Sequence, residues 1–339
     1  MILWEREKEM YIKSNELSKT RQLTWYFIIF IVLMIIPFIA SIFWTNLLTE
    51  ILIMGLAAMS VNLLLGYGGS LPFGHAAFFA SGAYATAILI KETNLPFAVV
   101  LILAPIAAAV VGAIFALIIT RLYAFYYAIV SACAGMVLWT LCRKMPLLGG
   151  DTGITGVDLP VLMSNVKAIY ILTAIIVFIM MVFIRVLLNS PFGWIQQAIR
   201  ENPTRVTCTG SNVLRHRYIA FVISSFICGI SGMLFVVHTQ STFPSYAHWV
   251  KSGDFVMICI LGGMNTFIGP MVGAAALITM QTYITSFTEN WLLVLGITIC
   301  LIVIFVPSGI MGLVKDLPEK IRSLSRKSNS ERRFDRMKG

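Results

Sequence analysis

The sequence has little charge. Only 12% of its 339 residues are Asp, Glu, Lys or Arg, whereas 58% are hydrophobic. Soluble domains carry about twice that share of charged residues. The apolar residues form solid blocks about as long as a bilayer-spanning helix, which needs about 20 residues, and the clearest block runs from Trp25 to Trp44. We therefore predict an integral membrane protein, and solid blocks favour helices over the alternating strands of a membrane barrel.

The chain also lacks the patterns of metal sites, disulfide frameworks and enzymes. Its six cysteines lie mostly in apolar blocks and show neither C-x-x-C nor Cys/His ligand spacing, so we expect them to be small core residues. There is no H-E-x-x-H, no G-x-S-x-G and no G-x-x-x-x-G-K-[ST] phosphate loop. We predict a protein without catalytic residues, cofactor or metal, so any ATP that drives it is hydrolysed by another subunit.

Ionisable side chains are scarce within the apolar blocks. Asp254 stands at the start of one block, and His75 and His238 lie within others. Proton- or sodium-coupled carriers usually place carboxylates or basic side chains at mid-membrane to relay the coupling ion. The sequence therefore favours a transporter or pore that is not driven by a coupled ion.

The expected fold is all-α, a polytopic transmembrane helix bundle of about ten spans with broken or short helices. The expected spans are 25–44, 51–65, 75–90, 96–120, 123–141, 168–188, 218–238, 254–264, 268–284 and 290–313. With a cytoplasmic N-terminus, few of the 25 Lys and Arg residues fall in outer segments, namely Lys91, Arg143, Lys144, Lys167 and Lys251. This positive-inside bias predicts that both termini are cytoplasmic.

The chain divides into three parts. Residues 1–24 are expected to be a cytoplasmic segment, 25–313 the transmembrane domain and 314–339 a basic cytoplasmic tail. The first block ends without an A-x-A cleavage pattern, so we expect a retained anchor rather than a signal peptide. We expect the tail to lie near anionic lipid headgroups, and nothing in it indicates nucleic-acid binding.

Glycines interrupt the second block in GYGGSLPFGHAAFF, residues 66–79. Glycine frees the backbone and Pro72 lacks an N–H, so we expect one helix to end here and another to begin near His75. Lipid cannot satisfy the exposed backbone groups, so the segment must be buried in protein or line a water-filled path. We interpret it as part of a translocation pathway. The alternative is a tightly packed hairpin in which His75 packs or caps and no ligand is contacted.

Two further stretches extend this interpretation. LGGMNTFIGPMVGAA, residues 261–275, repeats the glycine-rich break, and LLGGDTGITGVDLP, residues 147–160, is an outer segment that can close over a polar solute or be a plain turn-rich loop. The candidate pathway residues are Gly66, Gly68, Gly69, Ser70, Gly74, His75, Asp151, Thr152, Thr155, Gly262, Gly263 and Asn265.

The longest internal loop, 189–217, is expected to be folded. A first helix should end near Glu201, after which Asn202 caps a helix of about two turns that begins at Pro203. Gly210 suits the left-handed position beyond that helix. Such a short surface helix is suited to docking a partner, and the alternative is an amphipathic cap that contacts headgroups.

Together these motifs resemble the permease subunits of ATP-binding-cassette importers for branched-chain amino acids, specifically the longer of the two paralogous permeases. The segments that carry the resemblance are 66–89, 149–157, 190–232 and 253–277, in the expected order. The resemblance implies a multi-pass protein of the cytoplasmic (inner) membrane. Its implied partners are a second paralogous permease, two ATPase subunits docked at the 189–217 loop, and an extracytoplasmic solute-binding protein that delivers a small-molecule solute.

The resemblance also implies a set of ATPase-docking residues. They are Arg200, Glu201, Asn202, Pro203, Thr204, Arg205 and Gly210. The solute stays open, because the same architecture serves urea and short amides. Two other functions also stay open: a stand-alone channel or facilitator for a small neutral solute such as urea or an amide, and a structural membrane scaffold.

Overall fold

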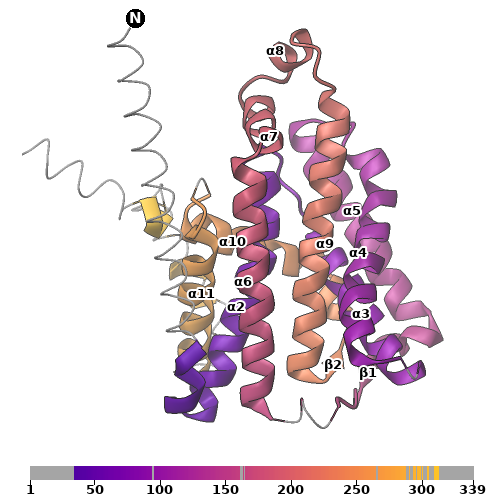
Figure 1. Ribbon diagram of the computed structural model, residues 1–339, viewed down its shortest axis with the longest axis vertical. Helices are drawn as coiled ribbons and strands as arrows, with labels where there is room; N and C mark the ends of the chain where they lie inside the picture. Colours follow the sequence, from indigo (N-terminus) through magenta and orange to yellow (C-terminus); the bar gives the residue numbers. More distant parts are fainter. Residues whose placement is uncertain are drawn as a thin grey trace, which may run out of the picture.

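The chain forms a bundle of α-helices (Figure 1), which confirms the predicted all-α class. The computed structural model describes residues 34–93, 95–160, 163, 165–264, 266–287, 290, 293–294, 296–298, 300, 304 and 309–312. Within these residues, five helices are long and apolar enough to cross a membrane. The protein is therefore a multi-pass membrane protein.

The long helices are joined by short segments, except after Lys144 and Asn189, where the connections are longer and carry several of the short elements. They are α2 (Ile42–Leu65), α3 (His75–Glu92), α4 (Phe97–Ile119), α5 (Ala124–Lys144), α6 (Val166–Asn189), α9 (Val213–Thr239), α10 (Trp249–Gly262) and α11 (Gly269–Phe287). The short elements are η1 (Pro146–Leu148), η2 (Gly150–Thr152), β1 (Ile154–Thr155), α7 (Pro191–Glu201), α8 (Pro203–Cys208), β2 (Ser241–Thr242) and η4 (Pro244–Ala247). Strands β1 and β2 pair antiparallel, with Ile154 opposite Thr242.

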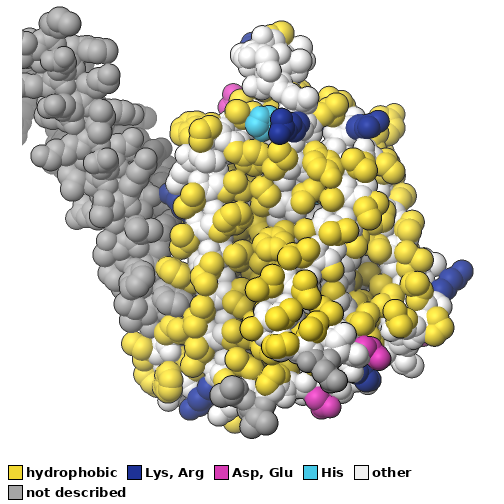
Figure 2. Space-filling view, turned by 45° about the vertical axis from the view of Figure 1, so that its right-hand side comes forward, with side chains coloured by type: hydrophobic (Ala, Val, Ile, Leu, Met, Phe, Trp, Pro, Cys, Tyr) yellow, Lys and Arg dark blue, Asp and Glu magenta, His cyan; other side chains and the backbone are white. Residues whose placement is uncertain are grey.

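Helices α2 and α9 form the centre of the bundle. The most apolar stretch of α2 is 89% buried and that of α9 is 78% buried, against about a third or less for α4, α5 and α6. Helices α3 and α4 pack on α9, and α6 and α11 pack on α2. The face in Figure 2 is broadly apolar, and its charged side chains lie mainly near its two ends. This distribution fits a body surrounded by lipid.

The centre is closely packed because glycines let backbones meet. A Cβ atom on Gly82 of α3 would collide with the carbonyl oxygen of Gly229 on α9, and one on Gly232 would collide with that of Phe79. Small residues permit this approach between membrane helices. The small residues that follow His75 therefore let α3 approach α9 closely.

The two ends of the bundle differ. Helices α7 and α8 lie at one end, and strands β1 and β2 lie at the other (Figure 1). The segments expected to be cytoplasmic and extracellular are therefore separated along the long axis. We call them the cytoplasmic end and the outer end.

The second span is longer than its apolar block suggests. It was expected at 51–65, but α2 begins at Ile42, so the predicted boundary near Trp44 is wrong. The remainder of the 25–44 block, as far as residue 33, lies outside the described residues. Polar residues enter the helix because their hydroxyls bond inside it: Thr49 Oγ1 donates to the Thr45 carbonyl at 2.7 Å.

Charged residues also lie within the helices. Helix α10 begins at Trp249 rather than at residue 254. Lys251, which was assigned to an outer segment, therefore lies in its first turn, and Asp254 follows one turn later. Glu50 lies within α2. The expectation of spans almost free of ionisable residues is wrong, and it no longer argues against an ion-coupled carrier.

The close packing of α3 on α9 makes a direct test possible. We expect Gly82→Ala to destabilise the protein by roughly 1–3 kcal/mol, because a methyl group must be forced against backbone. Gly253→Ala in α10 is the matched control, since a Cβ there meets nothing within 4 Å. Thermal unfolding of the purified protein in detergent should show a lowered Tm for the first variant only. Equal Tm values would contradict the packing described.

Candidate functional site

The glycine-rich break after α2 is present where the sequence predicts it. Helix α2 ends at Leu65 and α3 begins at His75. Of the residues between them, only Gly69 is exposed. The break is thus buried in protein, which is one of the two arrangements that a membrane allows for non-helical backbone.

Side-chain hydroxyls from distant helices accept hydrogen bonds from backbone N–H groups at the end of this break and at the start of α3. Ser131 Oγ on α5 accepts a hydrogen bond from the Phe73 N–H at 3.0 Å. Ser252 Oγ on α10 accepts one from the Ala76 N–H at 2.8 Å. The end of the break is therefore bonded to α5, and the first turn of α3 is bonded to α10.

His75 lies in the core, where it joins three helices. Its Nε2 lies 2.7 Å from Ser224 Oγ on α9, and that hydroxyl donates to the Ser60 carbonyl on α2 at 2.6 Å. A hydroxyl has one proton, so His75 Nε2 must be the donor. The ring is fully buried and meets Phe78 and Phe221 edge-on, at centroid distances of 5.5 and 5.9 Å. This geometry favours the packing role for His75, and its contact with a solute stays a prediction.

At the cytoplasmic end, α7 rests directly on the break. The Arg200 guanidinium donates from Nη1 to the Gly66 carbonyl. A Cβ on Gly69 would lie 2.7 Å from Arg200 Cγ, and one on Gly68 would lie 2.5 Å from Gln196 Nε2. The structure thus brings a predicted docking residue, Arg200, into contact with two predicted pathway glycines, Gly66 and Gly69, while Gln196 of the same helix contacts a third, Gly68.

The second glycine-rich break lies beside the first. Gly262 ends α10, and Gly263 follows with a φ of 109°, a conformation that favours glycine. A Cβ on Gly66 would collide with the carbonyl oxygen of Met264. Both breaks therefore meet at the cytoplasmic end, as the span order predicts. Asn265 lies outside the described residues.

The cytoplasmic loop folds as its sequence predicts. Asn202 Oδ1 accepts a hydrogen bond from the Arg205 N–H at 3.0 Å, and Pro203 is the first residue of α8. Gly210 has a φ of 84°, the left-handed conformation expected beyond the helix end.

Helix α8 projects from the bundle and exposes most of its surface. Of its six residues only Val206 is buried, where it packs with Ile199 and Val213. The predicted docking residues Glu201, Thr204, Arg205 and Gly210 are exposed, whereas Asn202 and Pro203 are half-buried. This end therefore offers a polar surface suited to a soluble partner.

The remaining pathway candidates lie at the outer end, apart from the glycine breaks. Asp151, Thr152 and Thr155 are exposed in the loop after α5. The Arg143 guanidinium donates a hydrogen bond to Asp151 and so lowers the pKa of that carboxyl group. Thr155 lies in β1, which ties this loop to the chain after α9.

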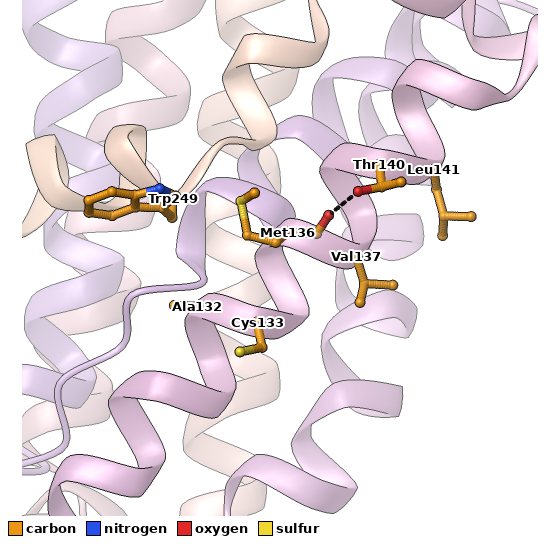
Figure 3. A pocket seen from close by; sticks show the side chains of 7 residues that line it. All are labelled: Ala132, Cys133, Met136, Val137, Thr140, Leu141 and Trp249. Atoms are coloured by element: carbon orange, nitrogen blue, oxygen red, sulfur yellow. Dashed lines mark hydrogen bonds between the residues drawn. The ribbon is translucent and has the colours of Figure 1, made fainter.

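An apolar groove of about 590 Å³ runs along α5 and was not predicted. Its lining is drawn in Figure 3: Ala132, Cys133, Met136, Val137, Thr140, Leu141 and Trp249. Thr140 Oγ1 donates to the Met136 carbonyl of its own helix at 2.9 Å, so the groove offers no strong hydrogen-bonding group from α5. Helical periodicity alone could not find it, because it needs Trp249 from a distant helix.

Comparison with known proteins gives one consistent result. Residues 43–303 match the family described as "Branched-chain amino acid transport system / permease component". The chain is 25% identical over 307 residues to the high-affinity branched-chain amino acid transport system permease protein LivM of Salmonella typhimurium and to LivM of Escherichia coli, covering 82% of this chain and 72% of each relative.

A third relative comes from an archaeon. The probable branched-chain amino acid transport permease protein LivM of Methanocaldococcus jannaschii is 27% identical over 239 residues, covering 65% of this chain and 68% of the relative. No solved structure matches.

The His75 cluster yields a second prediction. Ser224→Ala should lower the stability by roughly 1–3 kcal/mol, because it leaves the buried His75 Nε2–H without its partner. Ser231→Ala is the matched control on the same helix, since the Ser231 hydroxyl donates only to the Ile227 carbonyl of its own helix. Chemical or thermal unfolding in detergent measures both. A loss at Ser231 as large as that at Ser224 would contradict the linking role of the cluster.

Proposed function

We propose that this chain, which belongs to the branched-chain amino acid transport system permease family, is the transmembrane subunit of an ATP-binding-cassette importer. It translocates branched-chain amino acids across the inner membrane, and separate ATPase subunits supply the energy. A second permease completes the conduit, and an extracytoplasmic binding protein delivers the solute. The relatives' names support the transport role, whereas the energy source and the partners are our inference.

One observation carries the proposal: the contact between Arg200 and the Gly66 carbonyl. It joins the exposed α7–α8 hairpin to the break that interrupts the second span. An importer without a phosphate loop of its own needs such a link, because force generated by a soluble ATPase must reach the membrane segment. The geometry supplies it at a charge-assisted hydrogen bond, the stronger kind.

The mechanism follows from the two ends of that link. When the ATPases close, they move α8 and with it α7, because Val206, Ile199 and Val213 hold the hairpin together. Arg200 and Gln196 then displace the segment that begins at Gly66. That segment leads to His75 and Ser224 at the bundle centre, so the movement reaches the middle of the membrane. The two permeases rock and open the conduit alternately to each side.

Removal of the Arg200 link should uncouple ATP hydrolysis from transport. We expect Arg200→Met to reduce ATP-driven leucine uptake at least tenfold in proteoliposomes that contain the whole complex, with less effect on basal ATPase activity. Arg215→Met is the matched control, because it removes the same charge from an exposed position on the same loop. Equal uptake by both variants would remove Arg200 from the coupling route.

Deletion of residues 203–209 should abolish docking without unfolding the bundle. Val206 is the only buried residue of α8, so the loss of packing is small. We expect the ATPase subunits no longer to copurify with the permease pair, and solute-stimulated ATP hydrolysis to vanish. Persistence of both would eliminate this loop as the docking site, and uptake that continues without ATPase subunits would favour a facilitator.

A further inference from the structure

Helix α10 begins halfway across the bundle. Its first turn is bonded to the first turn of α3 through Ser252 and Ala76, and the adjacent His75 is bonded to Ser224, near the middle of α9. The residues of the first two turns of α10 therefore lie far from both ends of the bundle.

Charged groups lie at this depth on the open side of α10. Lys251 Nζ is 3.5 Å from Asp254 Oδ2, and the two side chains are 27% and 40% exposed. Glu50 of α2 is close enough to Lys251 to feel its charge. Exposure of charge to hydrocarbon is costly, so ionisable residues at this depth usually face a water-filled cavity or the bundle interior. This side of α10 therefore faces water or protein rather than lipid.

The neighbouring face of α5 leads to the same conclusion. Helices α4, α5 and α6 are equally open, yet the most apolar stretch of α5 is clearly less apolar than those of α4 and α6. Its exposed positions at helical spacing include three polar or weakly polar side chains, Tyr126, Cys133 and Thr140, with the apolar Ile129 and Val137 between them. A helix that is as exposed as its neighbours but less apolar is suited to a surface other than lipid.

The groove and the charges adjoin each other. Trp249 closes the groove along α5, and Lys251 and Asp254 follow within the next two turns of the same helix. Trp139 of α5 packs edge-on against His248, which precedes Trp249, at a centroid distance of 5.2 Å. This contact fixes the start of α10 against α5. At about 100° of rotation per residue, Asp254 lies about 140° and Lys251 about 200° around α10 from Trp249. The exposed surface of α10 therefore continues from Trp249 past Val250, which is 51% exposed, to Asp254 and then to Lys251.

We infer that this face is the subunit's contact surface for the transported amino acid in its zwitterionic form. The α5 groove and Trp249 contact the branched side chain, Lys251 faces the solute carboxylate, and Asp254 faces its ammonium group. The inference rests on the proposed function and deepens it. A neutral amide or urea offers neither the opposite charges nor the aliphatic group that this surface matches.

The pairing of Lys251 with Asp254 is suited to brief contact with a passing solute rather than to tight binding. Lys251 and Asp254 pair with each other at 3.5 Å. When an amino acid binds, its carboxylate pairs with Lys251 and its ammonium group pairs with Asp254, so neither side chain is left unpaired. The groove is open and apolar, so it adds little directional bonding. Both features predict brief, weak contact.

A charge swap tests the orientation of the solute. The double variant Lys251→Asp with Asp254→Lys is made in a Glu50→Gln background and compared with Glu50→Gln alone, because the swap would otherwise place a second carboxylate beside Glu50. In that background it keeps an opposite-charge pair three residues apart, so a merely structural pair tolerates it. We expect ATP-driven leucine uptake by the reconstituted complex to fall at least tenfold, while the variant still elutes as a complex with its partners. Uptake within twofold of the Glu50→Gln complex would overturn the inference.

Labelling of Cys133 provides a second measurement that does not depend on transport. Cys133 lies in the groove and is exposed. In a complex that carries Cys208→Ser and Cys300→Ala, which remove the other two exposed thiols, a charged methanethiosulfonate should modify Cys133, and millimolar leucine should slow the reaction while urea does not. Val110→Cys on α4, combined with Cys133→Ala, is the lipid-facing control, because Val110 is 54% exposed on a far more apolar helix.

The outcomes separate the inference from the proposed function. Reaction of Cys133 only with an uncharged maleimide indicates lipid, and no reaction with either reagent indicates cover by the second permease; each result overturns the inference. If the unmodified complex fails to concentrate leucine with ATP, the proposed function fails. If it concentrates leucine and the charge swap does too, the inference alone fails.

Discussion

Backbone that leaves a helix inside a membrane must find its hydrogen bonds within the protein, and this constraint determines how the bundle is built. The break after α2 needs donors and acceptors halfway across the bilayer. Ser131, Ser252 and Arg200 provide them from α5, α10 and α7. These bonds hold α5, α10 and α7 against the break and the first turn of α3.

Because of the same constraint, arginines at the cytoplasmic end stabilise the structure in addition to setting the orientation of the protein in the membrane. Arg200 bonds the Gly66 carbonyl, and Arg217 Nη1 donates to the Leu122 carbonyl at 3.4 Å in the α4–α5 turn. The Arg185 guanidinium lies 5.1 Å from the centroid of Phe267, beside the second break. Positive charge on this side is usually explained by membrane insertion alone. Here the arginines also contact backbone carbonyls and an aromatic ring in the segments that connect the helices. Arg200 thereby connects the α7–α8 hairpin to the segment that follows α2.

Local signals explain which features could be predicted from the sequence. The break at Gly66, the start of α3 at His75 and the Asn202 cap depend on residues within one turn of each other, and all three are confirmed. The hydroxyl partners could not be predicted, because Ser131 and Ser252 are far from residue 73 along the chain and look like small residues of apolar helices. Lys251 was assigned to the outer side because the apolar pattern starts after it.

Two non-helical segments enter the centre of the bundle from opposite ends. Residues 66–74 lead from the cytoplasmic end to the centre, and residues 240–248 lead there from the end that holds β2. Both come close to Gly135 of α5, where a Cβ would lie 3.5 Å from Gly74 Cα and 3.9 Å from the Ala247 carbonyl oxygen. Residues 66–74 are held by hydrogen bonds from Phe73 to Ser131 and from Arg200 to Gly66, and residues 240–248 are held by the ring contact between His248 and Trp139 of α5. Helix α5 contacts both segments and keeps one face open, so it connects the two ends of the bundle.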